Sequence, residues 1–203
     1  MCIRDRRQTN IVRMLAYSSI AQGGFILVPL AVAGDGGGAR VSFEAVLIYL
    51  FIYAAMNLGA FAVVIAVSRR TGSGEIDSYA GLGTSGPGLA ITLTIFLFSL
   101  AGLPPFAGWF AKFVMFRAVL DANSPSAIVL GVIAALGSVV AFFYYAAVAR
   151  KMWFHQPAPE ATTTPTPVPA ALTVAIGLTV AFTVVVGIYP QIIARIGELA
   201  FPI

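Results

Sequence analysis

Five long apolar stretches constrain this chain more than any other feature of its sequence. A helix needs about 20 mainly apolar residues to cross the roughly 30 Å hydrocarbon core of a bilayer. The stretches run over residues 14–32, 43–67, 89–120, 127–149 and 170 to about 193. Residues 43–67 and 127–149 are apolar on every face and lack the alternation of a barrel strand. We therefore predict an all-α membrane protein with five transmembrane helices.

The composition excludes the main classes of soluble protein. Of the 203 residues, 59% are hydrophobic and 10% are charged, whereas a soluble domain carries about 25% charged residues. The charged side chains form no basic stripe of the kind that indicates a nucleic-acid binder. The single cysteine, Cys2, and the single histidine, His155, exclude a disulfide framework and a thiolate or multi-histidine metal site. We expect the lipid bilayer as a partner, no nucleic acid, and no cofactor or metal in this chain.

The connectors between the apolar stretches contain residues that end or begin helices. The glycine-rich segment 34–38 predicts a turn, and the run Arg69-Arg70-Thr71-Gly72 predicts a helix end. Ser124-Pro125 is typical of an N-cap followed by a first-turn proline. Residues 156–169, rich in proline and threonine, are expected to form an extended surface loop.

Lysine and arginine near the ends of the spans predict the orientation of the chain. With the N-terminus in the cytoplasm, eight of the twelve basic residues flank spans on the cytoplasmic side and three flank them on the other side. Five crossings then place the C-terminus outside.

The third apolar stretch is too long for one upright crossing. Its 32 residues, 89–120, would extend about 48 Å as a continuous helix. Pro104 and Pro105 divide it into halves of roughly fifteen residues, because proline lacks a backbone donor and clashes with the preceding turn. Broken backbone at membrane depth persists only where protein or a water-filled cavity satisfies it. In transporters, such discontinuous helices form ion sites.

Lys112 follows this break, and three apolar or aromatic residues flank it on either side. A lysine inside a membrane costs on the order of 2.5–3.5 kcal/mol on insertion scales, and it can release and take up a proton, which an arginine cannot. We therefore interpret Lys112 as a proton relay. The alternative is a side chain that extends to the membrane boundary and has no role in transport. Counted along the helix, Lys112 could lie roughly 10 Å from the break, near half-depth to that boundary.

Other polar side chains fall inside the predicted spans. Tyr53 and Asn57 recur four residues apart with Tyr49, so the three share one helix face. Hydroxyl and amide groups can hold a chain of water molecules between titratable groups, but they also commonly bridge packed helices. The candidates for a proton path or for the helix break are Pro104, Pro105, Ser99, Gln22, Tyr53, Asn57 and Tyr144.

Three segments resemble a known family. Residues 13–20, RMLAYSSI, resemble the (K/R)-(L/M)-L-A-Y-S-S-(I/V) signature of the antiporter-like membrane subunits of respiratory complex I. Residues 99–113, SLAGLPPFAGWFAKF, resemble the S-L-A-G-(I/L)-P-P and G-F-x-x-K-F segment of these subunits. Residues 49–63 are similar to the subunit N branch of NADH-quinone oxidoreductase. The resemblance extends from residue 8 to the end of the chain.

The resemblance implies a function and a set of partners. It implies an enzyme subunit that takes part in proton translocation coupled to electron transfer from NADH to quinone. The chain would lie beside other membrane subunits of complex I in the bacterial inner membrane, and NAD, FMN, iron–sulfur clusters and quinone would be bound by partner subunits. Lys112 would correspond to the family's lysine on a broken helix, whereas Gln22 stands where a histidine is common and cannot titrate.

The resemblance also limits what this chain contains. Family members have fourteen helices, so the chain is expected to correspond to the last five, as residues 8–203, with residues 1–7 outside the family pattern. Two alternatives remain open. The chain could belong to an Mrp-type cation/proton antiporter, or it could be a non-conducting membrane scaffold.

Overall fold

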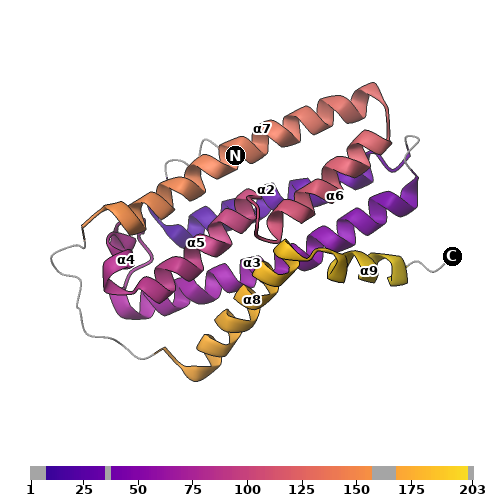
Figure 1. Cartoon of the computed structure of the whole chain (residues 1–203). Coiled ribbons are helices and arrows are strands. Elements are labelled where there is room, and N and C mark those ends of the chain that lie inside the picture. Colours follow the sequence, from indigo (N-terminus) through magenta and orange to yellow (C-terminus); the bar gives the residue numbers. More distant parts are fainter. Residues whose placement is uncertain (1–7, 35–37, 157–167, 201–203) are drawn as a thin grey trace.

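The regular elements of the chain are helices. The computed structural model describes residues 8–34, 38–156 and 168–200 (Figure 1). Within them lie α2 (Ile11–Ala31), α3 (Ala39–Thr71), η1 (Ile76–Tyr79), α4 (Leu82–Ser85), α5 (Pro87–Ala101), α6 (Gly108–Asp121), α7 (Pro125–Phe154), α8 (Ala170–Ile188) and α9 (Gln191–Ala200). In these ranges the only β pairing is an isolated bridge between Asn10 and Glu75. Helices α2, α3, α7 and α8 are long and apolar enough to cross a membrane. The predicted all-α membrane fold is confirmed.

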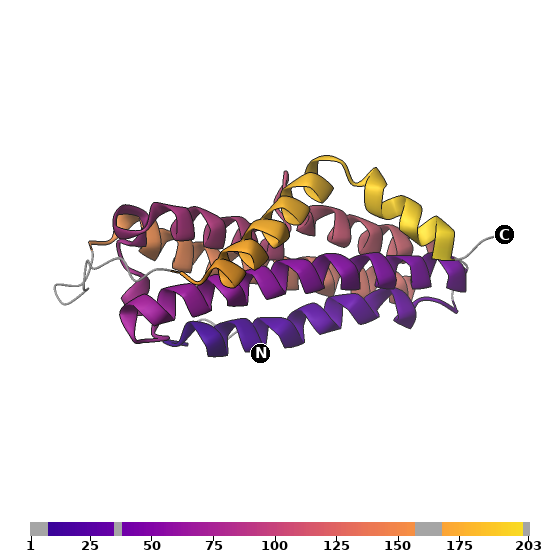
Figure 2. The ribbon, with the colours of Figure 1, turned by 90° about the horizontal axis from the view of Figure 1, so that it is seen from below.

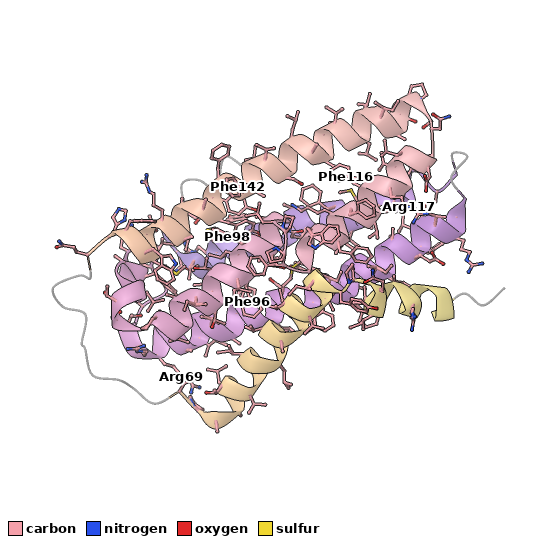
Figure 3. The ribbon with its side chains drawn as sticks, viewed as in Figure 1. Arg69, Phe96, Phe98, Phe116, Arg117 and Phe142 are labelled. Atoms are coloured by element: carbon pink, nitrogen blue, oxygen red, sulfur yellow. The ribbon has the colours of Figure 1, made fainter. Side chains whose placement is uncertain are left out.

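Helix α3 lies at the centre of the bundle and contacts α2, α5, α6, α8 and α9. Its close approach to α5 depends on Gly59, because the ring of Phe96 occupies the space that a side chain there would fill. Phe96 is buried and Phe98 partly buried along the middle of the bundle, whereas Arg69 and Arg117 lie towards opposite ends (Figure 3). These two arginines thus lie away from the apolar middle of the bundle.

Several helix ends are those predicted. Helix α3 ends at Gly72, which has φ +67° and follows Arg69 and Arg70 in the last turn. Helix α7 begins with the Ser124 side chain as N-cap and Pro125 in the first turn. The connector after α3 contacts the end of α7, where the backbone amide of Gly81 donates to the carbonyl of Lys151. We call this end of the bundle the basic end; it carries Arg69, Arg70, Arg150 and Lys151. Most of the predicted loop 156–169 and part of the turn 34–38 lie outside the described residues.

Two predicted spans are broken rather than one. The third divides as expected into α5, with 15 residues, and α6, with 14 residues, on either side of Pro104 and Pro105. The expectation of a continuous fifth helix to about residue 193 is wrong, because α8 ends at Ile188 and α9 begins at Gln191. Figure 2 shows α8 and α9 meeting at an angle on one side of the bundle. Pro190 explains the break, because a proline disfavours the helical conformation of the residue before it, and Tyr189 has φ −128° and ψ 72°.

Candidate functional site at the broken helix

The end of α5 satisfies its first two free carbonyls through the backbone. The C-terminal end of a helix leaves four carbonyls without an intrahelical hydrogen-bond donor. In the hydrocarbon core of a membrane, no water is present to supply the missing donors. The amide of Gly102 donates to the carbonyls of Phe98, at 3.1 Å, and Ser99, at 2.9 Å, while that of Leu103 donates to Phe98 at 3.0 Å. Gly102 has φ +91°, the left-handed conformation that this helix end requires and that glycine adopts without strain.

Two side chains from other helices satisfy the remaining two carbonyls. Gln22 of α2 donates through Nε2 to the carbonyl of Leu100 at 3.0 Å. Lys112 of α6 donates through Nζ to the carbonyl of Ala101 at 2.8 Å. All four carbonyls at the end of α5 therefore have a partner, and the last two depend on residues predicted as site candidates.

The start of α6 is held by α5 and α8. The backbone amide of Gly108 donates to the Ser99 hydroxyl at 3.0 Å, and that of Ala107 donates to the carbonyl of Thr183 at 2.9 Å. Trp109 Nε1 donates to the carbonyl of Gly187 at 2.8 Å. A side chain at Gly187 would meet the backbone of the segment between α5 and α6, so glycine permits this contact. No motif in the sequence of α8 indicated that this helix forms part of the site.

The Lys112 side chain is buried and only 7% exposed. Its Nζ lies 5.1 Å from the ring centroid of Phe25, within the range of a cation–π interaction. Among the described residues, Lys112 forms no ion pair with a carboxylate. The partial negative charge at the C-terminal end of α5 favours the ammonium form, whereas removal from water disfavours it. These two effects oppose each other, as a site that exchanges a proton requires.

Lys112 follows Pro105 by seven residues, but its side chain extends back towards the break. Nζ of Lys112 reaches the end of α5 itself, at the carbonyl of Ala101. The reason is the direction of helical side chains, which lean towards the N-terminus of their own helix. Helix α6 begins at the break, so its side chains lean back towards α5. The amine is turned towards the interior of the bundle rather than extended along α6.

A second set of polar contacts lies beside Gln22, which is fully buried. The Tyr49 hydroxyl donates to Gln22 Oε1 at 2.7 Å, so the carboxamide joins α3 to the end of α5 through α2. The Ser18 and Tyr145 hydroxyls are hydrogen-bonded to each other. The ring of Tyr144 lies 4.4 Å from that of Tyr145, centroid to centroid. Hydroxyl and amide groups from three helices thus form one buried cluster.

The remaining candidate residues differ in whether they contact the helix break. Ser99 is buried at the end of α5, where its hydroxyl contacts both Gly108 and the sulfur of Met56. Pro104 and Pro105 form the connector itself, joined by a cis peptide bond. Tyr53 interacts with Ser19, and both Tyr53 and Asn57 are partly exposed. Within the described ranges, neither donates to nor accepts from Lys112. No group of three or more potential metal-ligating side chains occurs there either.

Comparison with known proteins identifies the family. A sequence model of the family described as "NADH:quinone oxidoreductase/Mrp antiporter, TM" matches residues 5–138, which contain the helix break and Lys112. The chain belongs to this family. The resemblance predicted from the sequence motifs is therefore confirmed.

The relatives and solved structures agree with this family. The chain is 40% identical to the NADH-quinone oxidoreductase subunit N of Heliobacterium modesticaldum, over 95% of the chain and 39% of that relative. It is 48% identical to the chloroplastic NAD(P)H-quinone oxidoreductase subunit 2 of Mesostigma viride, over 71% of the chain and 27% of that relative. A membrane-bound sulfane sulfur reductase, described as an archaeal respiratory membrane complex, matches with TM-score 0.83 and 30% identity over 96% of this chain and 31% of its own.

The Mrp complex from Dietzia sp. shares the fold, with TM-score 0.81 and 20% identity over 98% of this chain and 43% of its own. The chain spans about a third to two fifths of the length of the first curated relatives that it matches.

Proposed function

We propose that this chain is part of a membrane subunit of a proton-translocating NADH:quinone oxidoreductase, and that Lys112 relays the proton. The observation that carries the proposal is the buried lysine Lys112, whose amine donates to the last carbonyl of α5, the first half of the broken helix. The names of relatives about 40% identical to the chain support the choice of complex. Likeness to the Mrp complex, at 20% identity, concerns the fold alone.

In the proposed mechanism, Lys112 alternates between its charged and neutral forms. The end of α5 favours the charge and burial opposes it. A charge change on a lysine of another helix of the whole subunit, outside this chain, shifts the balance, and Lys112 releases its proton to the outer side. Gln22 and Ser99 hold the two helix ends in place while this happens. Tyr53, Asn57 and Tyr144 remain candidates for the path that supplies or removes the proton.

We further propose the setting in which this chemistry takes place. The basic end of the bundle faces the cytoplasm of a bacterial inner membrane, in line with the usual excess of lysine and arginine on that side, and the C-terminus lies outside. Other membrane subunits of complex I are the partners. NAD, FMN, iron–sulfur clusters and quinone are bound in those partner subunits, so that electron transfer takes place outside this chain.

The test compares Lys112→Met and Lys112→Arg in the assembled complex, in inverted membrane vesicles. The relay predicts that both variants lose most proton pumping, because neither side chain exchanges a proton in this environment. NADH oxidation and dye quenching report electron transfer and pumping separately. Lys151→Met, at the basic end, is the matched control and should pump normally. Wild-type pumping by Lys112→Met would refute the relay.

The same preparations separate the two alternatives. An Mrp-type antiporter predicts a pH change that depends on sodium and not on NADH. A non-conducting scaffold predicts that Lys112→Met leaves pumping unchanged and increases stability, since it removes a buried charge.

A further inference from the structure

A pocket of about 410 Å³ opens at the basic end, between α2, α7 and the connector that contains η1. It takes no part in the relay proposed for Lys112. Its lining includes Arg150, Lys151 and His155 near the end of α7, which we call the mouth, and the apolar residues Met14, Phe143 and Val148. The pocket therefore combines cationic groups at one end with apolar groups at the other.

The charges at the mouth favour an anion. Lys151 pairs with Asp77 of η1, which neutralises one positive charge and one negative charge. Arg150 is exposed, and within the described part of the chain no carboxylate pairs with it. His155 is exposed beside it and adds a further hydrogen-bond donor. The guanidinium of Arg150 is thus available to a phosphate group, which it can contact through two N–H groups at once.

The apolar lining lies further along α7 than the mouth. Phe143 precedes Arg150 by seven residues, which places it about 10 Å further along α7 and away from the basic end. The Phe143 side chain is 60% exposed, whereas Met14 and Val148 are 1% and 2% exposed and form the floor. A ligand that fills the pocket must therefore be charged at one end and apolar about 10 Å away.

We propose that this pocket binds an anionic phospholipid, with the phosphate at Arg150 and the first part of an acyl chain along Phe143. Basic pockets between transmembrane helices on the cytoplasmic side suit anionic headgroups. The lipid satisfies both ends of the pocket, whereas a soluble anion contacts only the mouth. The proposal does not depend on the role of Lys112.

The test uses the complete chain in detergent and measures bound lipid by native mass spectrometry. Phosphatidylglycerol and phosphatidylcholine with identical acyl chains are titrated in parallel, and phosphatidylglycerol is expected to remain bound. Arg150→Gln should weaken its binding roughly fivefold, the effect of about 1 kcal/mol per basic residue. Arg117→Gln, at the opposite end of the bundle, is the matched control and should leave binding unchanged. Ala147 of α7 lines the pocket as well. Ala147→Trp fills the pocket without changing its charge and should abolish binding.

Four results would overturn the proposal. Equal binding of the two lipids would remove the role of the charge. An equal loss in Arg117→Gln would indicate general attraction to basic residues. Displacement by millimolar inorganic phosphate would indicate a soluble anion. In the assembled complex, crosslinking of Ala147→Cys to another polypeptide segment rather than to lipid would identify protein as the occupant.

Discussion

The carboxamide of Gln22 joins Tyr49 of α3 to the carbonyl of Leu100 at the end of α5. Gln22→Leu keeps a side chain of similar size and removes both hydrogen bonds. An unsatisfied buried group costs about 1–3 kcal/mol in soluble proteins, whereas hydrogen bonds between membrane helices average about 0.6 and reach about 1.7 kcal/mol. Taking about 1 kcal/mol for each orphaned group, we expect Gln22→Leu to cost about 2 kcal/mol.

Combining Gln22→Leu with Tyr49→Phe tests whether the two side chains share a hydrogen bond. Tyr49→Phe leaves only Gln22 Oε1 without a partner and should cost about 1 kcal/mol. The double variant leaves only the Leu100 carbonyl and should also cost about 1 kcal/mol, so the coupling energy is about 2 kcal/mol. Unfolding of the chain by sodium dodecyl sulfate in mixed micelles, followed by circular dichroism, measures all three. Gln191→Leu, exposed on α9, controls for the substitution itself. Additive costs in the double variant would refute the shared hydrogen bond.

Two glycines at the break should be far more sensitive than glycines elsewhere on the same helices. Gly102→Ala should lower the free energy of unfolding by at least about 2 kcal/mol, because φ is +91° and the new Cβ would lie 2.6 Å from Cδ of Lys112. Gly88→Ala has nothing within 4 Å of the new Cβ, so it should leave the free energy of unfolding unchanged or raise it by up to about 1 kcal/mol. Gly187→Ala should likewise destabilise α8, because its Cβ would meet the backbone between α5 and α6, whereas Gly177→Ala meets nothing within 4 Å and should stabilise by up to about 1 kcal/mol. The same unfolding assay checks both pairs, and equal effects within a pair would contradict the contacts described.

The membrane environment of the chain and the break between α5 and α6 could be predicted from the sequence, because each has a local cause. Apolar stretches of sufficient length require a bilayer, and two adjacent prolines remove two donors from one helix. The second break was missed because Pro190 is a single proline followed by Ile192 and Ile193, so the apolar stretch continues through it. Hydropathy reports the environment of a segment, but it does not report whether its backbone is continuous.

The contacts of the site were harder to predict than its members. Lys112 could be found because a charge is rare in an apolar segment, and Gln22 and Ser99 could be found as polar residues at depth. Their partners are mainly backbone carbonyls of α5, which have no sequence signature. Phe25 is one of 15 phenylalanines, and nothing in its local sequence distinguishes it from those that face lipid. Which helix faces meet is decided by packing, which a single apolar pattern does not specify.

The contact between Lys112 and Ala101 has a consequence for how quickly such a group can cycle. An ammonium carries three N–H donors, and the neutral amine that remains after proton loss still carries two. The carbonyl of Ala101 therefore keeps its partner in both charge states. In the relay proposed above, the amine would therefore change its charge by one unit without the helix end refolding, and only a small rearrangement would be needed at this position.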